Sequence, residues 1–199
     1  MGKIVGFVLL AVVVIGGASC VSSYNKLVSL GQGVDAQWAQ VENTYQRRAD
    51  LIPNLVETVK GAAKFEQGTL TAVTEARARV GQISPQATEK IVNDPAAFQR
   101  FQQAQDGLSS ALSRLLVVSE QYPDLKATAN FRDLQAQLEG TENRISVERM
   151  RFNETAQAFN TARDSFPTTI IAGIFGSRFA EKAYFHAQAG ASAPPQVKF

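Results

Sequence analysis

The sequence predicts an all-α protein, in which an N-terminal membrane anchor is followed by a long antiparallel, up-and-down helical bundle of three long helices and a short C-terminal helix. Apolar residues recur at steps of three and four along most of the chain, which is the spacing of one helix face. No segment of the sequence alternates apolar and polar residues with the period of two that a half-buried strand would show. We therefore expect an anchor at residues 1–21, a bundle at residues 22–186, and a disordered tail at residues 187–199, which is rich in alanine, glycine and proline.

The anchor is predicted by the apolar run Ile4–Ile15, which follows Lys3 and leads into small residues. Counted to Val21, the apolar stretch is close to the length of about 20 residues that a helix needs to cross a bilayer. Two kinds of anchor remain open. One is an uncleaved signal-anchor helix. The other is a lipoprotein signal, because Gly17–Cys20 resembles a bacterial lipobox in which Cys20 would be lipidated and residues 1–19 removed.

The orientation follows from the charges beside the apolar run. Lys3 and the α-amino group lie on its N-terminal side, whereas Lys26 is the only nearby positive charge on the other side. The positive-inside rule then places the N-terminus in the cytoplasm. We therefore expect the protein in the bacterial inner (cytoplasmic) membrane, with its body on the extracytoplasmic, periplasmic side.

The first long helix is predicted over about residues 22–80. Its apolar stripe keeps the same phase on both sides of Pro53, which indicates one helix kinked at the proline. Two helices broken near residues 49–53 are the alternative, because the residues before a proline avoid helical geometry. The stripe consists of Leu27, Leu30, Val34, Trp38, Val41, Tyr45, Arg48, Ile52, Leu55, Val59, Ala62, Glu66, Leu70, Val73 and Val80.

Two further long helices complete the bundle, and coiled-coil-like seams would join the three. Asp94 and Pro95 provide an N-cap and a proline at the first helical position, and this helix ends near Gln121. The third helix starts around Lys126–Phe131 and keeps its 3–4 spacing as far as Phe166. A short helix over residues 168–175 follows. Because the second helix is short, residues 22–50 must form a stalk, pair with the C-terminal part or fold back separately.

Composition excludes several classes of function. The net charge of +2 is too small to indicate a nucleic-acid partner. With one cysteine and one histidine, the chain lacks the donors for a disulfide framework and for most all-protein zinc sites. A single histidine, His186, also leaves no convincing Ser-His-Asp arrangement. We therefore predict no cofactor, no metal ion and no enzymatic activity.

The candidate contact residues lie around Pro53 and on the third long helix. A polar face near the proline is either solvated or a docking surface for a partner; its charged and amide members are Arg47, Asp50, Asn54, Glu57 and Lys64. Arg48, Glu66 and Glu148 lie on the seams instead, where a charge is costly unless it is paired. We expect Arg48 to pair with Glu142 or Glu148 of the third helix. Three poor helix formers there predict interhelical hydrogen bonds, namely Asn143, Asn153 and Asn160.

Several motifs resemble the LemA family of bacterial membrane proteins. The most specific is DLIPNLVETVKG at Asp50–Gly61, and the order and spacing of motifs match from Tyr24 to about Phe185. The other motifs are Tyr24–Val28, Arg47–Ala49, Thr141–Ile145, Arg151–Asn153, Phe159–Asn160 and Ser165–Pro167. The resemblance implies a membrane anchor, a four-helix up-and-down bundle and no established enzymatic activity. It also implies an association with membrane metalloproteases or TPM-domain proteins.

The function expected from these observations is that of a membrane-tethered scaffold or adaptor of the cell envelope, with a protein partner, a homo-oligomer or both. Self-assembly is expected if Trp38, Val41 and Tyr45 lie on an exposed stalk. The alternative is an accessory or regulatory subunit of a membrane metalloprotease or of a TPM-domain partner.

Overall fold

The computed structural model describes residues 2–61, 66–83 and 91–186. The expected disordered tail and the candidate residue Lys64 lie outside these ranges. The described part of the chain is helical and contains no strand. Its elements are α1 (Gly2–Lys60), α2 (Gln67–Gln82), α4 (Pro95–Ser119), α5 (Pro123–Ala127), α6 (Ala129–Asp164), α7 (Thr168–Phe175) and the 3₁₀ helix η2 (Gly176–Phe179).

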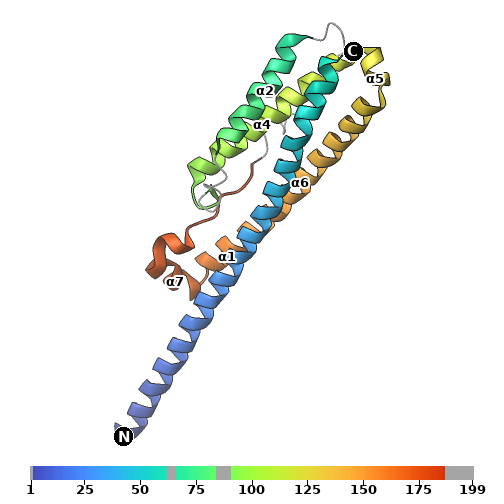
Figure 1. Ribbon diagram of the computed structural model, residues 1–199. Helices are drawn as coiled ribbons and strands as arrows, with labels where there is room; N and C mark the ends of the chain where they lie inside the picture. Colours follow the sequence, from blue (N-terminus) through green and yellow to red (C-terminus); the bar gives the residue numbers. More distant parts are fainter. Residues whose placement is uncertain (1, 62–65, 84–90, 187–199) are drawn as a thin grey trace, which may run out of the picture.

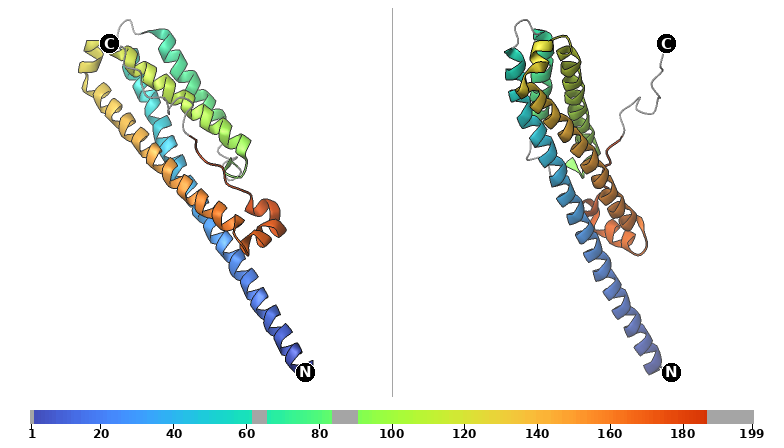
Figure 2. Two further views of the ribbon diagram at one scale, coloured as in Figure 1. Left: turned by 180° about the vertical axis from the view of Figure 1, so that it is seen from behind. Right: turned by 90° about the vertical axis from the view of Figure 1, so that its right-hand side faces the viewer.

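The helices form an elongated antiparallel bundle (Figures 1 and 2). Helix α1 runs the length of the bundle and projects beyond it at the N-terminus, and α6 packs along α1 in the opposite direction. Helices α2 and α4 pair with each other over the half of the bundle that is farthest from the N-terminus. Helix α7 lies at the other end, beside the point where α1 leaves the bundle. The predicted all-α class and up-and-down arrangement are confirmed.

The prediction of one helix over residues 22–80 is wrong. Helix α1 ends at Lys60, and the chain reverses before α2 begins at Gln67. The reversal lays Leu70 and Val73 against α4, where both are buried. A straight continuation would carry these residues past the end of α1 into solvent, so burial of apolar surface favours the turn. The unbroken 3–4 spacing across the turn is therefore coincidental.

Pro53 lies inside α1, and the helix continues through it. Since proline has no backbone N–H, the carbonyl of Ala49 loses its usual helical partner. The side chain of Arg77, from α2, donates from Nε to this carbonyl oxygen at 3.2 Å. The two-helix alternative with a break near residues 49–53 is thus excluded, and α2 supplies a substitute for the lost hydrogen bond.

Replacing Pro53 by alanine should raise the free energy of unfolding by about 1–2 kcal/mol. A proline inside a helix costs about 3 kcal/mol relative to alanine, and the contact from Arg77 offsets part of this. Urea unfolding of the detergent-solubilised protein, followed by circular dichroism, measures the change. Arg77→Ala should cost about 1 kcal/mol in the natural chain and less in the Pro53→Ala chain. A loss of stability in Pro53→Ala would contradict the prediction and show that packing requires the proline.

The core of the half nearer the N-terminus is aromatic. The ring of Trp38 contacts those of Phe98, Phe101 and Phe152, with centroids 5.2–5.6 Å apart. Trp38, Val41 and Tyr45 are therefore buried, and the expectation that they lie on an exposed stalk is wrong. The reason is that α6 covers this part of α1, so that residues 22–50 pair with the C-terminal part of the chain. The argument for self-assembly from exposed apolar side chains is removed.

Candidate functional site

A buried polar layer crosses the middle of the bundle and is centred on Arg48 of α1. This side chain is only 1% exposed. Its Nη1 atom donates to Glu142 at 2.8 Å and to the hydroxyl of Ser109 at 2.7 Å. Its Nη2 atom donates to the backbone carbonyl of Gln105 at 3.3 Å and also to the Gln105 side chain. One guanidinium thus joins α1, α4 and α6.

The other acids expected on the seams have different surroundings. Glu142 and not Glu148 pairs with Arg48. Glu148 is partly buried and accepts hydrogen bonds from Gln37 at 2.6 Å and from Arg151 at 3.0 Å. Glu66 is exposed at the N-cap position of α2, because the helix that would have buried it ends at Lys60. The expectation of a seam position for Glu66 is therefore wrong.

Arg149 is a second cation in the polar layer, and the sequence reading missed it. Its Nε atom donates to the Tyr45 hydroxyl at 2.6 Å, and Nη2 donates to Asp106 of α4 at 3.0 Å. The guanidinium also lies over the rings of Tyr45 and Phe185, at 5.6 and 5.0 Å from their centroids. The sequence did offer one signal of this contact. Tyr45 lies on the apolar seam, and a buried tyrosine hydroxyl usually needs a polar partner.

Burial raises the pKa of Tyr45 to about 12, although the nearby charges of Arg149 and Arg48 favour the ionised form. Because the pKa in the folded state is raised, the neutral phenol contributes stability that is complete below pH 10. This contribution is lost as the pH rises towards 12.

Tyr45→Phe should therefore change the pH dependence of stability. Near neutral pH the variant should be about 1 kcal/mol less stable, since Arg149 loses one acceptor. Above pH 10, Tyr45 ionises in the unfolded chain but stays largely neutral in the folded one, which stabilises the unfolded state of the natural protein only. The stability advantage of the natural protein over the variant should therefore shrink and then reverse. Urea unfolding of both proteins at several alkaline pH values tests this. Parallel stability curves would contradict it.

Two of the three candidate asparagines hold the segment at residues 180–186, here named the C-terminal strap. Asn160 donates to the carbonyl of Lys182 and accepts from its N–H, both at 2.9 Å. Asn153 makes the same pair of bonds with the backbone of Phe185, again at 2.9 Å. Gln102 of α4 repeats the arrangement with the backbone of His186, at 2.7 and 3.3 Å. Side-chain amides thus pair with the strap as a neighbouring strand would.

The third asparagine, Asn143, is exposed and does not contribute to this arrangement.

The C-terminal strap also contributes buried side chains to the bundle. Phe185 packs against both Trp38 and Phe98, with ring centroids 6.1 and 4.7 Å away. The buried Lys182 donates to Asn93 at 2.6 Å, and burial lowers the pKa of this ammonium group.

The polar face around Pro53 lies in solvent. Arg47, Asp50, Asn54 and Glu57 are all exposed. Its contacts are local, such as the ion pair of 2.8 Å between Glu57 and Lys60 three residues later. Exposed ion pairs of this kind contribute little to stability, so the fold does not depend on these side chains.

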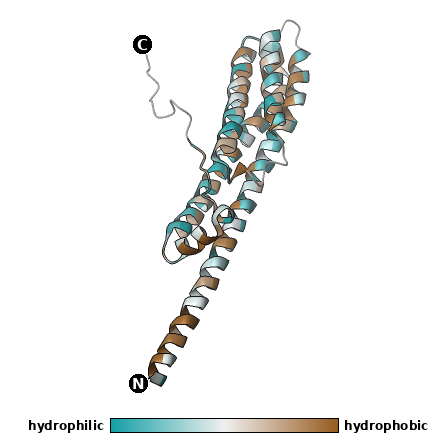
Figure 3. Ribbon diagram, turned by 90° about the vertical axis from the view of Figure 1, so that its left-hand side faces the viewer, coloured by the Kyte–Doolittle hydropathy of each residue, from teal (hydrophilic) through white to brown (hydrophobic). Residues whose placement is uncertain are grey.

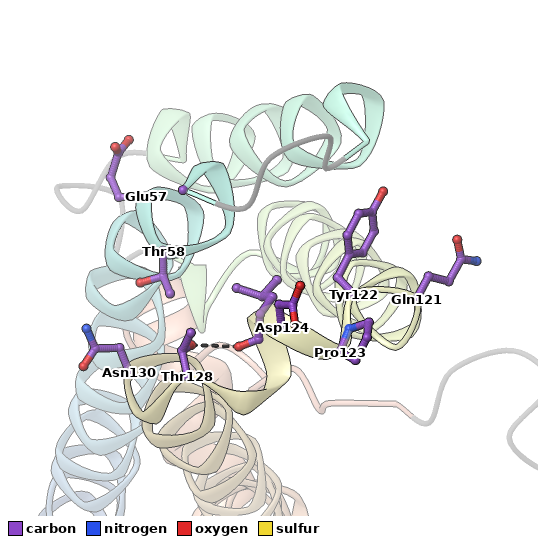
Figure 4. A pocket seen from close by; sticks show the side chains of 10 residues that line it. Glu57, Thr58, Gln121, Tyr122, Pro123, Asp124, Thr128 and Asn130 are labelled. Atoms are coloured by element: carbon purple, nitrogen blue, oxygen red, sulfur yellow. Dashed lines mark hydrogen bonds between the residues drawn. The ribbon is translucent and has the colours of Figure 1, made fainter.

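A pocket of about 760 Å³ lies at the end of the bundle that is farthest from the N-terminus (Figure 4). Glu57 and Thr58 of α1 line it on one side, and Tyr122 and Asp124 line it at the start of α5. The opposite wall is the start of α6, where Asn130 is exposed.

Within the described ranges, no group of three or more His, Cys, Asp or Glu side chains could hold a metal ion.

The N-terminal part of α1 is a candidate membrane anchor. All described residues before Ser23 are exposed, and α1 is long and apolar enough to cross a membrane. Figure 3 shows its hydrophobic residues projecting beyond the bundle. Cys20, the candidate lipid attachment site, is a free and exposed cysteine near the end of this stretch.

Comparisons with known proteins found a family model and several relatives. A model of the LemA family matches residues 37–199. Magnetosome protein MamQ of Magnetospirillum gryphiswaldense is 27% identical over 191 residues, covering 87% of this chain and 70% of that protein. Magnetosome protein MamQ 1 of Paramagnetospirillum magneticum is 25% identical, with 89% and 70% coverage.

Protein LemA of Metamycoplasma hominis is 23% identical over 132 residues, covering 66% of this chain and 55% of that protein. None of these names denotes an enzymatic function. The apolar N-terminal part of α1, which is long and apolar enough to cross a membrane, suggests that the protein is associated with a membrane. Since the family match spans most of the sequence, the chain belongs to the LemA family.

Proposed function

We propose that this protein is a membrane-tethered helical scaffold or adaptor of the bacterial cell envelope, which acts through protein contacts and not as an enzyme. The observation that carries the proposal is the continuity of α1. This single helix of 59 residues begins as an exposed apolar segment and continues into the bundle, where its buried residues form part of the core. From Val21 to Lys60 it would extend about 60 Å at 1.5 Å per residue. A rod of this kind holds its far end at a fixed distance from the bilayer.

The docking site we propose is the pocket at the far end of the rod. It combines apolar lining from Leu125, Tyr122 and Pro123 with the carboxylates of Glu57 and Asp124. An apolar floor with an acidic edge suits a protein segment that presents an apolar side chain beside a basic one. The exposed polar face around Asn54 borders the pocket through Glu57 and would extend the contact.

The proposed location is the inner membrane, with the bundle on the periplasmic side. The support is the charge difference across the apolar stretch, between Lys3 and the α-amino group on one side and Lys26 on the other. Either an uncleaved helix or a lipidated Cys20 would hold the bundle there. The intact mass of the membrane-extracted protein distinguishes the two anchors, because lipidation would remove residues 1–19 and add acyl mass.

Site-specific photo-crosslinking in cells tests the docking proposal. A photoreactive residue replacing Asn130, at the wall of the pocket, should capture a defined envelope protein. The matched control replaces Asn143, which is exposed on the same helix but outside the pocket. Asp124→Lys should abolish capture at position 130 by reversing the charge at the pocket edge. Equal capture at both positions, or none at position 130, would contradict the proposal. Capture of a membrane protease would favour the accessory-subunit alternative, and capture of a second copy would favour self-assembly.

A further inference from the structure

An exposed apolar stripe lies on α7 and on the turn that precedes it. Phe166, Ile170 and Ile174 are spaced four residues apart and are 81%, 52% and 70% exposed, and Phe175 is 45% exposed. The opposite face of α7 packs into the bundle through Ile171. An eight-residue helix with apolar residues on both faces has more apolar surface than its own bundle covers.

The stripe lies at the level where α1 leaves the bundle. The ring of Tyr24 on α1 is 5.0 Å from that of Phe175 and 5.6 Å from that of Phe179, between centroids. Tyr24 follows Val21, the last residue of the apolar stretch, by three positions, which is about 4.5 Å along the helix axis. Figure 3 shows the same relation, with hydrophobic residues in both the projecting part of α1 and the α7 region.

This level corresponds to the headgroup region of a bilayer that contains the anchor. The headgroup and interfacial layer is about 5–8 Å thick on each side of the hydrocarbon core. Aromatic rings such as those of Tyr24 and Phe175 favour this layer. The guanidinium of Arg178 lies 5.6 Å from the Tyr24 ring centroid, and Lys26 is exposed nearby on α1. Both cations suit the phosphates of lipid headgroups.

We infer that Phe166, Ile170, Ile174 and Phe175 form a second membrane contact, which inserts into the headgroup–acyl boundary beside the anchor helix. The inference rests on the proposed membrane tether. A single transmembrane helix can tilt and rotate in the bilayer, whereas a second contact at its side fixes both motions. The lipid-bound α7 would therefore set the direction in which the rod presents its far end.

Spin labels at single cysteines in the full-length protein test the inference. Cys20→Ser removes the natural thiol, and the labelled positions are Ile174→Cys, Val13→Cys in the anchor and Val117→Cys on α4. Val117 is the matched control, because it is an exposed aliphatic residue near the end of α4. This end of α4 leads into α5, at the end of the bundle farthest from the N-terminus (Figure 1). In vesicles of phosphatidylethanolamine and phosphatidylglycerol, collisions with oxygen relative to a water-soluble nickel complex report depth. The ratio should be highest at position 13, lowest at position 117, and several-fold higher at position 174 than at position 117.

Each other outcome has a distinct meaning. A deep label at position 13 with position 174 as accessible to nickel as position 117 would overturn the second contact and leave the tether intact. A nickel-accessible label at position 13 would overturn the uncleaved helical tether, on which the inference rests, and the inference with it. Spin–spin broadening at position 174, with shielding from both reagents, would overturn lipid insertion and show that a second copy of the chain covers the stripe. Ile170→Cys provides an independent label on the same stripe, with the same expected result as Ile174→Cys.

Discussion

Replacing Asn160 by alanine should lower the free energy of unfolding by about 3 kcal/mol and release the C-terminal strap. The substitution removes three hydrogen bonds, two with the backbone of Lys182 and one from Asn160 to the Tyr184 hydroxyl. Each is worth about 1 kcal/mol, and a buried backbone group left unpaired costs about 1–3 kcal/mol more. Detachment of the strap would rehydrate those groups and so limit the total loss.

Two measurements on the detergent-solubilised protein separate these effects. Urea unfolding gives the change in stability, and hydrogen exchange of residues 180–186 reports whether the strap has left the bundle. Asn143→Ala is the matched control, because it makes the same change at an exposed position of the same helix. It should alter stability by less than about 0.5 kcal/mol. Equal effects of the two substitutions would mean that the amide pairing at Asn160 does not hold the strap.

The periodicity of the sequence predicted the parts of the fold in which packing is helix against helix. The stripe of α6 is largely buried as expected up to Ala162, whereas Phe166 lies beyond the helix end at Asp164 and is exposed. Asp94 caps α4 as predicted, by accepting from the backbone N–H groups of Ala96 and Ala97. The end of α1 at Lys60 could not be predicted from the stripe, because α2 resumes the same spacing after the turn. Gly61, directly after the last helical residue, was the local signal of a helix end.

The sequence predicted those residues of the candidate site that interrupt an apolar helix face. It did not predict the residues that lie outside such a face. Arg48 was found because a charge on an apolar seam needs a partner, and Glu142 provides it. Arg149 was missed because a cation beside a seam is usually solvated, and only the tertiary fold brings Tyr45 and Asp106 to it. The strap has no periodicity, so its place between α4 and α6 depends on distant residues alone.

Glu142→Ala should destabilise the protein by about 2–3 kcal/mol, because it leaves the Arg48 guanidinium buried without a counter-ion. Breaking a buried ion pair from one side costs about 3–5 kcal/mol. The lower value applies here, since the Glu142 side chain is 47% exposed and Arg48 keeps its bonds to Ser109 and Gln105. Urea unfolding measures the loss, with Glu139→Ala as the control, because Glu139 is an exposed acid one turn earlier on α6.

The decisive comparison places the same substitution in a chain that carries Arg48→Met. Methionine keeps much of the buried volume but removes the charge, so Glu142 then has no cation to neutralise and can remain hydrated. Glu142→Ala should therefore cost less than about 0.5 kcal/mol in that background, and the difference between the two backgrounds is the coupling energy of the pair. If Glu142→Ala costs the same with and without Arg48, the pair does not hold α1 against α6. The apolar seam would then determine the alignment of these two helices without help from the polar layer.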